Sequence, residues 1–140
     1  NTQLGQKLGL IETSRFGEQK LAVIGETPQA MTLTALADTI SRVLLRKPMI
    51  VGDPNKPIRH IAWCTGAAQS YFEEAIQMNI DAFITGEISE QTVHIARESG
   101  VAFLSAGHHA TERYGVQALG EHIAQKFGVN HQFIDIDNPV

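Results

Sequence analysis

The clearest chemical signal in the sequence is a histidine and a glutamate four residues apart, His108 and Glu112. If a helix begins by His108, both side chains lie on one helix face and can reach a common ion. Imidazole nitrogen and carboxylate oxygen suit zinc, iron, manganese or nickel, and the ligand types alone do not choose among these metals. The alternative is structural: His108 caps or packs at the helix start, and Glu112 pairs with a base such as Arg113. Two ligands are also fewer than the three or four that zinc normally takes from a protein.

Three more polar residues are candidates for roles beside this pair. His109 points about a hundred degrees away from His108 on a regular helix, so it is expected to support the site or contact substrate. Glu87 follows a Thr-Gly turn and is predicted to act as a general acid or base, or to orient a ligand. The alternative for Glu87 is an acid stabilised by a helix N-terminus. For His94, one helix turn beyond Glu90, the residues alone predict a partly buried histidine with its hydrogen bonds satisfied.

The elements that position these residues alternate along the chain. Three strand–glycine–helix units are predicted, with strands at 59–65, 82–85 and 101–105 and helices at about 70–78, 90–99 and 110–127. Before them we predict a helix closed by Gly9, a strand at 19–26, a helix capped by Thr32 or Thr34 that stops before Pro48, and a strand at 48–52. A last strand is predicted at 131–136. This pattern indicates an α/β fold, a layered domain with a mixed to mostly parallel sheet.

Polar residues gather at the turns where the predicted strands pass into helices. The three turns cover residues 65–70, 85–90 and 107–112. Ligands of open α/β sheets bind outside the carboxyl ends of the strands, so we expect these turns to meet on one rim that carries the site.

Length and composition limit the classes of protein that are possible. The chain has 140 residues, enough for one domain, and 11 Lys and Arg against 15 Asp and Glu give a net charge of −4, which does not support a dedicated nucleic-acid binder. The single cysteine, Cys64, excludes an intrachain disulfide and a Cys-cluster zinc site, and it is predicted to be buried. No membrane span or signal peptide is evident, so a cytoplasmic location is expected. Because the chain begins at Asn1 and opens on a pattern typical of the tail of a helix, we expect a fragment.

Several runs of residues together resemble one known family. They are Trp63-Cys64-Thr65-Gly66, residues 81–91, residues 106–113 and the ending at 133–139. The chain resembles the C-terminal part of the NGG-interacting-factor-three-like family, whose bacterial YbgI-type members carry the name GTP cyclohydrolase type two homologue. On this resemblance residues 1–140 form the C-terminal portion of the family's α/β fold, without its N-terminal metal-binding half.

The resemblance implies a dinuclear metal protein that assembles as a toroidal hexamer, a trimer of dimers, with two divalent metal ions per full-length chain. His108 corresponds to a metal ligand and Glu112 to a ligand that touches both ions. The family's other ligands come from an N-terminal His-His-Gly turn and a later His and Asp, which this sequence lacks. The chain alone is therefore expected to be inactive.

The activity implied by the resemblance is a GTP cyclohydrolase-like ring opening of a nucleotide by a metal-bound hydroxide. In that interpretation Glu87, His94 and His109 serve as proton carriers or contact the base. The alternative is a ring-shaped regulatory protein that binds nucleic acid or a partner protein without turnover. A third interpretation is an oligomerisation domain with no complete site.

Overall fold

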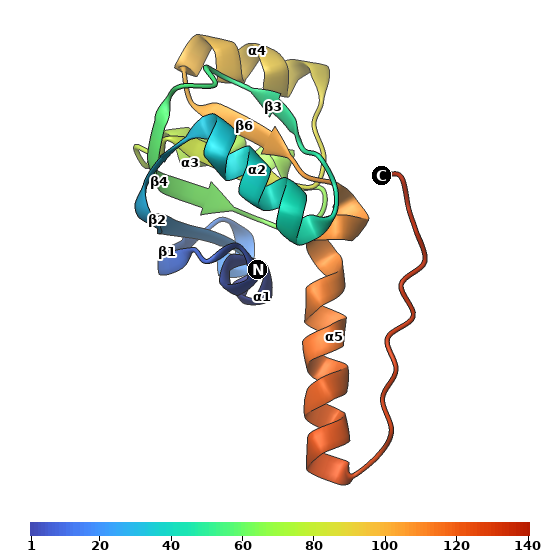
Figure 1. Ribbon diagram of the computed structural model, residues 1–140. Coiled ribbons are helices and arrows are strands. Elements are labelled where there is room, and N and C mark those ends of the chain that lie inside the picture. The colour runs from blue at the N-terminus through green and yellow to red at the C-terminus, as the bar shows by residue number, and fades with distance from the viewer.

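All three predicted strand–glycine–helix units form in the computed structural model, which describes residues 1–140 (Figure 1). The helices are α1 (Thr2–Leu8), α2 (Leu33–Leu44), α3 (Phe72–Ile76), α4 (Glu90–Ser99) and α5 (His108–Phe127), with short 3-10 turns at Glu18–Lys20 and Gln69–Tyr71. The strands are β1 (Ile11–Phe16), β2 (Ala22–Thr32), β3 (Met49–Val51), β4 (Pro57–Trp63), β5 (Ala82–Thr85) and β6 (Ala102–Ser105). No helix has both the length and the apolar content needed to cross a membrane.

The strands form one six-stranded mixed sheet in the order β1-β2-β4-β5-β6-β3. Strands β4, β5 and β6 are parallel, because the helices α3 and α4 carry the chain back between them. Strands β1 and β2 pair antiparallel at one edge, and β3 pairs antiparallel with β6 at the other. The predicted α/β class is confirmed, and the parallel part is confined to the three central strands.

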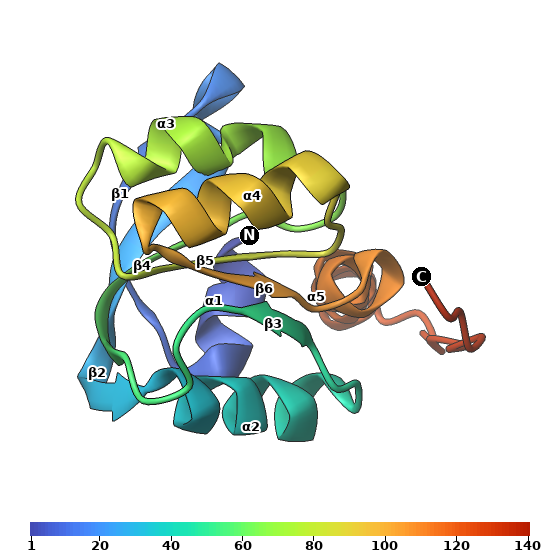
Figure 2. The same cartoon turned by 90° about the horizontal axis from the view of Figure 1, so that it is seen from above.

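Helices cover both faces of the sheet (Figure 2). One hydrophobic cluster lies under α1, α2 and the start of α5, and a second lies under α3 and α4. Neighbouring strand residues point to opposite faces, so Trp63 enters the first cluster and Cys64, as predicted, is buried in the second. The Trp63 indole packs so closely on α1 that a Cβ added at Gly5 would lie 2.6 Å from its ring.

Local capping chemistry sets the ends of several helices. The Thr32 side chain accepts a hydrogen bond from the Ala35 N–H at 3.2 Å, so the structure selects Thr32 over Thr34 as the cap of α2. Ser89 caps α4 in the same way through the Thr92 N–H. Gly9 closes α1 in the left-handed conformation predicted for it.

The strand predicted at 19–26 is shifted, because Glu18–Lys20 form a 3-10 turn and β2 runs over Ala22–Thr32. Two strands at the ends of the chain differ more. Strand β1 was not predicted, because only its last residue is buried and its polar sequence lacks the pattern of a half-buried strand. The strand predicted at 131–136 is wrong: residues 129–140 form no regular structure. The alternating apolar residues are present there, but Ile134 and Ile136 are 71% and 75% exposed and no neighbouring strand pairs with them.

Helix α5 packs on the domain only through its first turns. Its buried residues are Ala110, Thr111 and Tyr114, and the rest of the helix projects away from the sheet (Figure 1). The projecting part exposes a stripe of apolar side chains, made of Val116, Leu119, Ile123 and Phe127. The chain then turns back along the helix, and the Val140 carbonyl accepts a hydrogen bond from the His109 N–H at 3.2 Å.

Candidate metal centre

The three glycine-containing turns meet at the carboxyl ends of the parallel strands, as predicted. The Gly86 N–H donates to the Gly66 carbonyl at 2.8 Å, and the Gly107 N–H donates to the Gly86 carbonyl at 3.0 Å. The fully buried Thr85 hydroxyl also donates to the Gly66 carbonyl, at 2.9 Å. These bonds join the ends of β4, β5 and β6 into one rim, so the side chains that follow them are held close together.

Two of these glycines allow the rim to close around the start of α5. Gly66 has φ +70°, and a Cβ at this position would strike the Glu112 carboxylate. A Cβ at Gly86 would lie 2.6 Å from the His108 Cα and 2.7 Å from the Gly66 carbonyl oxygen. Gly66 is favoured for its left-handed conformation, since the Glu112 side chain could move aside, whereas Gly86 is required for space because a Cβ there would meet backbone atoms.

The side chains of Glu87, His108 and Glu112 form one cluster on this rim. Glu87 Oε1 lies 2.7 Å from His108 Nδ1, and Glu112 Oε2 lies 3.1 Å from His108 Nε2. Helix α5 begins at His108, so the two residues four apart share a face as the spacing predicted. The His108 ring is thus held between two carboxylates, and its side chain remains 37% exposed.

The electrostatics of the cluster favour positive charge. The hydrogen bond that the His108 ring donates to Glu87 raises the pKa of His108 above its ordinary value, and the charge of Glu112 raises it further, while partial burial opposes both effects. Carboxylates that stabilise an imidazolium stabilise a bound cation by the same Coulombic attraction.

The structure contradicts the alternative in which Glu112 pairs with Arg113. The Arg113 guanidinium instead donates to Asp135 at 2.7 Å and to the Leu44 carbonyl at 2.8 Å. His109 points away from His108, as predicted, and its Nε2 lies 2.8 Å from Asp135 Oδ1. Hydrogen bonds to His109 and Arg113 lower the pKa of Asp135. Asp135 belongs to one of the runs that carry the family resemblance, but no residue spacing pointed to its contact with His109, because it lies in the tail after α5, residues 129–140, whose path only the folded chain defines.

His94 does not lie where its spacing predicted. It was predicted to be partly buried with satisfied hydrogen bonds, but it is exposed on α4 and makes no hydrogen bond or ion pair. The buried residues of α4 are Thr92 and Ala96, so the position between them faces solvent. Its predicted role in catalysis remains a prediction.

Two cavities have His109 in their lining, and the first of them also borders His108 and Glu112 of the cluster. The first, about 480 Å³, is lined by His108, Glu112, Val116 and Phe133 among others. The second, about 320 Å³, is lined by Arg46 and Arg113 with Asp135 and the end of the tail. No three His, Cys, Asp or Glu side chains of this chain are arranged to hold one metal ion. Glu87 is hydrogen-bonded to Nδ1 of the His108 ring. The donors that remain for a cation are therefore His108 Nε2 and the Glu112 carboxylate.

These features define a class of protein: a layered α/β domain that presents a histidine and carboxylates at the carboxyl ends of its parallel strands, where such sheets bind ligands. Comparison with known proteins identifies the family within this class. The chain belongs to the family described as Duf34/NIF3 (NGG1p interacting factor 3), whose model matches residues 1–139. The resemblance seen in the sequence motifs is thereby confirmed.

Relatives of known sequence and structure agree with this assignment. A Neisseria meningitidis serogroup B protein named GTP cyclohydrolase 1 type 2 homolog is 52% identical over 139 residues, which cover 99% of this chain and 56% of that protein. A Pseudomonas aeruginosa protein of the same name is 46% identical, with 99% of this chain and 56% of that protein covered.

Among solved structures, the protein ybgI superimposes with a TM-score of 0.95 at 43% identity, covering all of this chain and 56% of that one. The protein TTHA1606 from Thermus thermophilus has a TM-score of 0.79 at 24% identity and covers 98% of this chain and 54% of that one, which shows a shared fold. The chain thus spans about half the length of the relatives it matches.

Proposed function

We propose that this chain supplies part of the metal centre of a metal-dependent hydrolase that opens the ring of a guanine nucleotide. The observation that carries the proposal is the His108 ring, with Nδ1 bonded to Glu87 and Nε2 beside Glu112. The name GTP cyclohydrolase 1 type 2 homolog, which relatives at 46–52% identity carry, supports the choice of substrate class.

The donor set fits a divalent cation. Histidines that bind metals commonly donate their other ring N–H to a carboxylate, which fixes the ring and raises its basicity. Glu87 accepts the Nδ1 proton of His108 in this arrangement, and the Nε2 lone pair then faces the side of Glu112. Of the two roles that the sequence left open for Glu87, this geometry supports the orienting one. Nitrogen and carboxylate donors suit zinc, iron, manganese or nickel.

The remaining ligands would come from outside these residues. Asn1 lies at the same rim, because its side-chain oxygen accepts the Thr65 N–H at 2.7 Å, and Thr65 adjoins the Gly66 that abuts Glu112. In a longer protein a segment preceding Asn1 would enter the fold beside His108. This location supports a site completed by the half of the relatives' length that this chain does not match.

A bound divalent cation would polarise the substrate and lower the pKa of water held next to it. The chain's own residues then have separate tasks. Glu87 holds the His108 ring, and the Glu112 carboxylate neutralises positive charge beside Nε2. His109, with its Nε2 fixed by Asp135, borders both cavities and is the histidine best placed to move a proton to or from a bound base.

Metal content tests the site directly. We would measure bound zinc, iron, manganese and nickel in this chain and in a form extended at the N-terminus, together with the mass of each in solution. The extended form is expected to hold about two ions per chain and to form a hexamer, and this chain is expected to hold almost none. Tight binding of two ions by this chain alone would contradict the assignment of the remaining ligands.

Matched variants on α5 separate a ligand from a structural residue. In the extended form, His108→Asn and Glu112→Gln are expected to abolish metal binding and metal-dependent ring opening of GTP. His122→Asn and Glu121→Gln change the same residue types at exposed positions of the same helix and are expected to leave both unchanged. Salt-dependent binding of single-stranded nucleic acid without turnover would instead support a regulatory binding protein.

A further inference from the structure

Every hydrogen bond between the tail, residues 129–140, and the rest of the chain runs from a donor of the domain to an oxygen of the tail. The Asp135 carboxylate accepts from His109 and Arg113, and carbonyls of the tail accept from Arg46 and from the His109 N–H. None of the tail's apolar side chains belongs to either hydrophobic cluster. The tail is thus attached largely through acceptor oxygens, one carboxylate among them, that sit on a group of basic donors.

The basic donors are positioned by the domain and do not depend on the tail. The Arg113 side chain is only 13% exposed, its Nη2 donates to the Leu44 carbonyl at 2.8 Å, and its guanidinium carbon lies 5.5 Å from the centre of the Tyr114 ring. Arg46 lies against the start of α5, because a Cβ at Gly107 would be 2.5 Å from its Nε. Both arginines line the cavity of about 320 Å³, so two positive charges meet there.

The Asp135 carboxylate is bound in this cavity as an oxyanion ligand would be. One of its oxygens lies 2.8 Å from His109 Nε2, and the other accepts from Arg113 Nη1 at 2.7 Å. Arginine uses the same planar set of donors for carboxylates and for phosphates. A phosphate has more acceptor oxygens and more negative charge than a carboxylate. In place of Asp135 it would hold the His109 ring in the same way and offer a further oxygen to Arg46.

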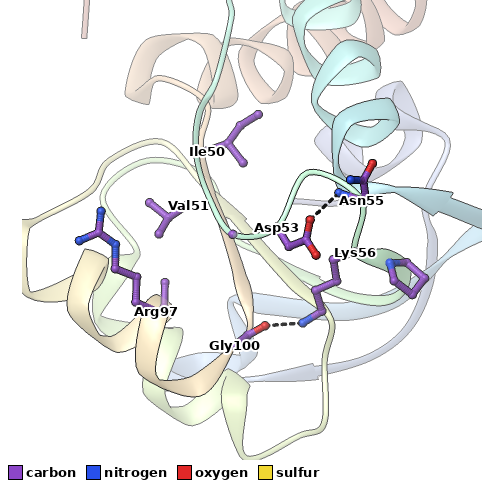
Figure 3. A pocket seen from close by; sticks show the side chains of 10 residues that line it. Ile50, Val51, Asp53, Asn55, Lys56, Arg97 and Gly100 are labelled. Carbon is purple, nitrogen blue, oxygen red and sulfur yellow. Dashed lines mark hydrogen bonds between the residues drawn. The ribbon is translucent and has the colours of Figure 1, made fainter.

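The larger cavity beside β3 and α4 lacks this arrangement, although it also contains basic residues (Figure 3). Its volume is about 660 Å³, and Figure 3 shows Arg97 and Lys56 at opposite sides of it. The Lys56 ammonium donates to the Gly100 carbonyl, and the Asp53 carboxylate belongs to the same lining. Arg97 is exposed and makes no ion pair, so it serves as a control for the two arginines beside the tail.

The cavity beside the tail adjoins the candidate metal centre. It shares His109, Arg113 and Asn138 with the cavity of about 480 Å³ that borders His108 and Glu112. A ligand that enters one cavity can therefore extend into the other. A nucleotide has the matching division of chemistry, with a base at one end and a chain of phosphates at the other.

We propose that Arg46, Arg113 and His109 form a phosphate subsite that binds the phosphate chain of a nucleoside triphosphate, and that the tail closes it by placing Asp135 where a phosphate binds. The identity of the base rests on the proposed function, whereas binding of phosphate does not. A single cavity closed by one carboxylate suits a compact triphosphate, and the net charge of −4 does not favour a long nucleic acid.

Calorimetric titration with inorganic tripolyphosphate in a chelating buffer tests the subsite in this chain. Asp135→Asn removes the charge and one acceptor oxygen that the tail places on the arginines. The variant is expected to bind tripolyphosphate about tenfold more tightly than the wild type, the factor expected if the tail fills the subsite about nine-tenths of the time. Asp137→Asn removes a charge from the lining of the same cavity that has no partner, and it is expected to change the affinity little.

Arginine variants in the Asp135→Asn background locate the binding site. Arg46→Gln removes one charge, and Arg113→Lys removes the planar set of donors while keeping the charge. Each is expected to weaken tripolyphosphate binding about tenfold. Arg97→Gln, at the other cavity, is expected to leave the affinity unchanged. Circular dichroism shows whether each variant is folded, which matters most for Arg113 because it also holds the Leu44 carbonyl.

The outcomes that overturn the proposal are distinct. They are no binding of tripolyphosphate by Asp135→Asn, an equal gain in Asp137→Asn, or an equal loss in Arg97→Gln. GTP is expected to gain affinity from Asp135→Asn and guanosine is not, so an equal gain for guanosine overturns it as well. An equal gain for a single-stranded oligonucleotide would assign the subsite to nucleic acid. None of these measurements involves metal or ring opening, so their failure leaves the metal centre standing, and a missing metal leaves the subsite standing.

Discussion

Replacing Gly86 with alanine is expected to destabilise the fold at the point where the candidate metal centre is assembled. The added Cβ would lie 2.6 Å from the His108 Cα, 2.7 Å from the Gly66 carbonyl oxygen and 2.9 Å from the His108 nitrogen. All three are backbone atoms, and all three distances fall below the 3.4 Å at which ordinary van der Waals contact begins. No side chain can rotate away to relieve the overlap, so the turns themselves must separate.

The size of the effect follows from what that separation breaks. Overpacking of a close-packed site costs about 1–3 kcal/mol. The Gly86 N–H donates to Gly66 and its carbonyl accepts from Gly107, and each strained or lost bond adds about 1 kcal/mol. We therefore expect the free energy of unfolding to fall by about 3 kcal/mol, which lowers Tm by roughly 10 °C for a domain of this size.

Thermal and urea unfolding followed by circular dichroism measure this loss. Gly115→Ala is the matched control, because Gly115 is exposed on α5 and a Cβ there meets nothing within 4 Å. Removing a glycine from a helix interior is expected to stabilise the protein by about 0.5–1 kcal/mol. If Gly86→Ala unfolds within about 1 °C of the wild type, the close approach of the turns does not limit stability and our account of the rim is wrong.

Two further expectations can be checked by NMR. In protein treated with a chelator, His108 is expected to titrate above its ordinary pKa of about 6.5, and Glu87→Gln, which removes the largest cause, is expected to lower that pKa. Because the folded pKa is raised, the stabilisation from this pair is complete below pH 6.5 and is lost as the pH rises through the raised value, so the stability difference between wild type and Glu87→Gln should shrink at alkaline pH. Amide hydrogen exchange is expected to be fast over residues 116–127 of α5 and slow over its first turns, because an unpacked helix of this length is marginal in water. Equal protection along α5 would show that its projecting part is packed in solution.

The sequence alone determined those parts of the fold and site that depend on near neighbours in the chain. The helix register that puts His108 and Glu112 on one face is set by about 3.6 residues per turn, so their spacing was sufficient. The opposite directions of Trp63 and Cys64 follow from the alternation of a strand. The three strand–glycine–helix units likewise predicted the parallel centre of the sheet and the rim at its carboxyl ends.

Tertiary structure decided everything that joins distant segments. Glu87 meets His108 only because β5 and β6 are parallel neighbours, and Asp135 meets His109 only because the tail folds back along α5. The apolar alternation at 131–136 forms no strand, because a strand requires a partner edge and periodicity cannot supply one. Side-chain periodicity is a local property of the backbone, whereas pairing between strands and contacts between turns depend on which surfaces the whole chain leaves free.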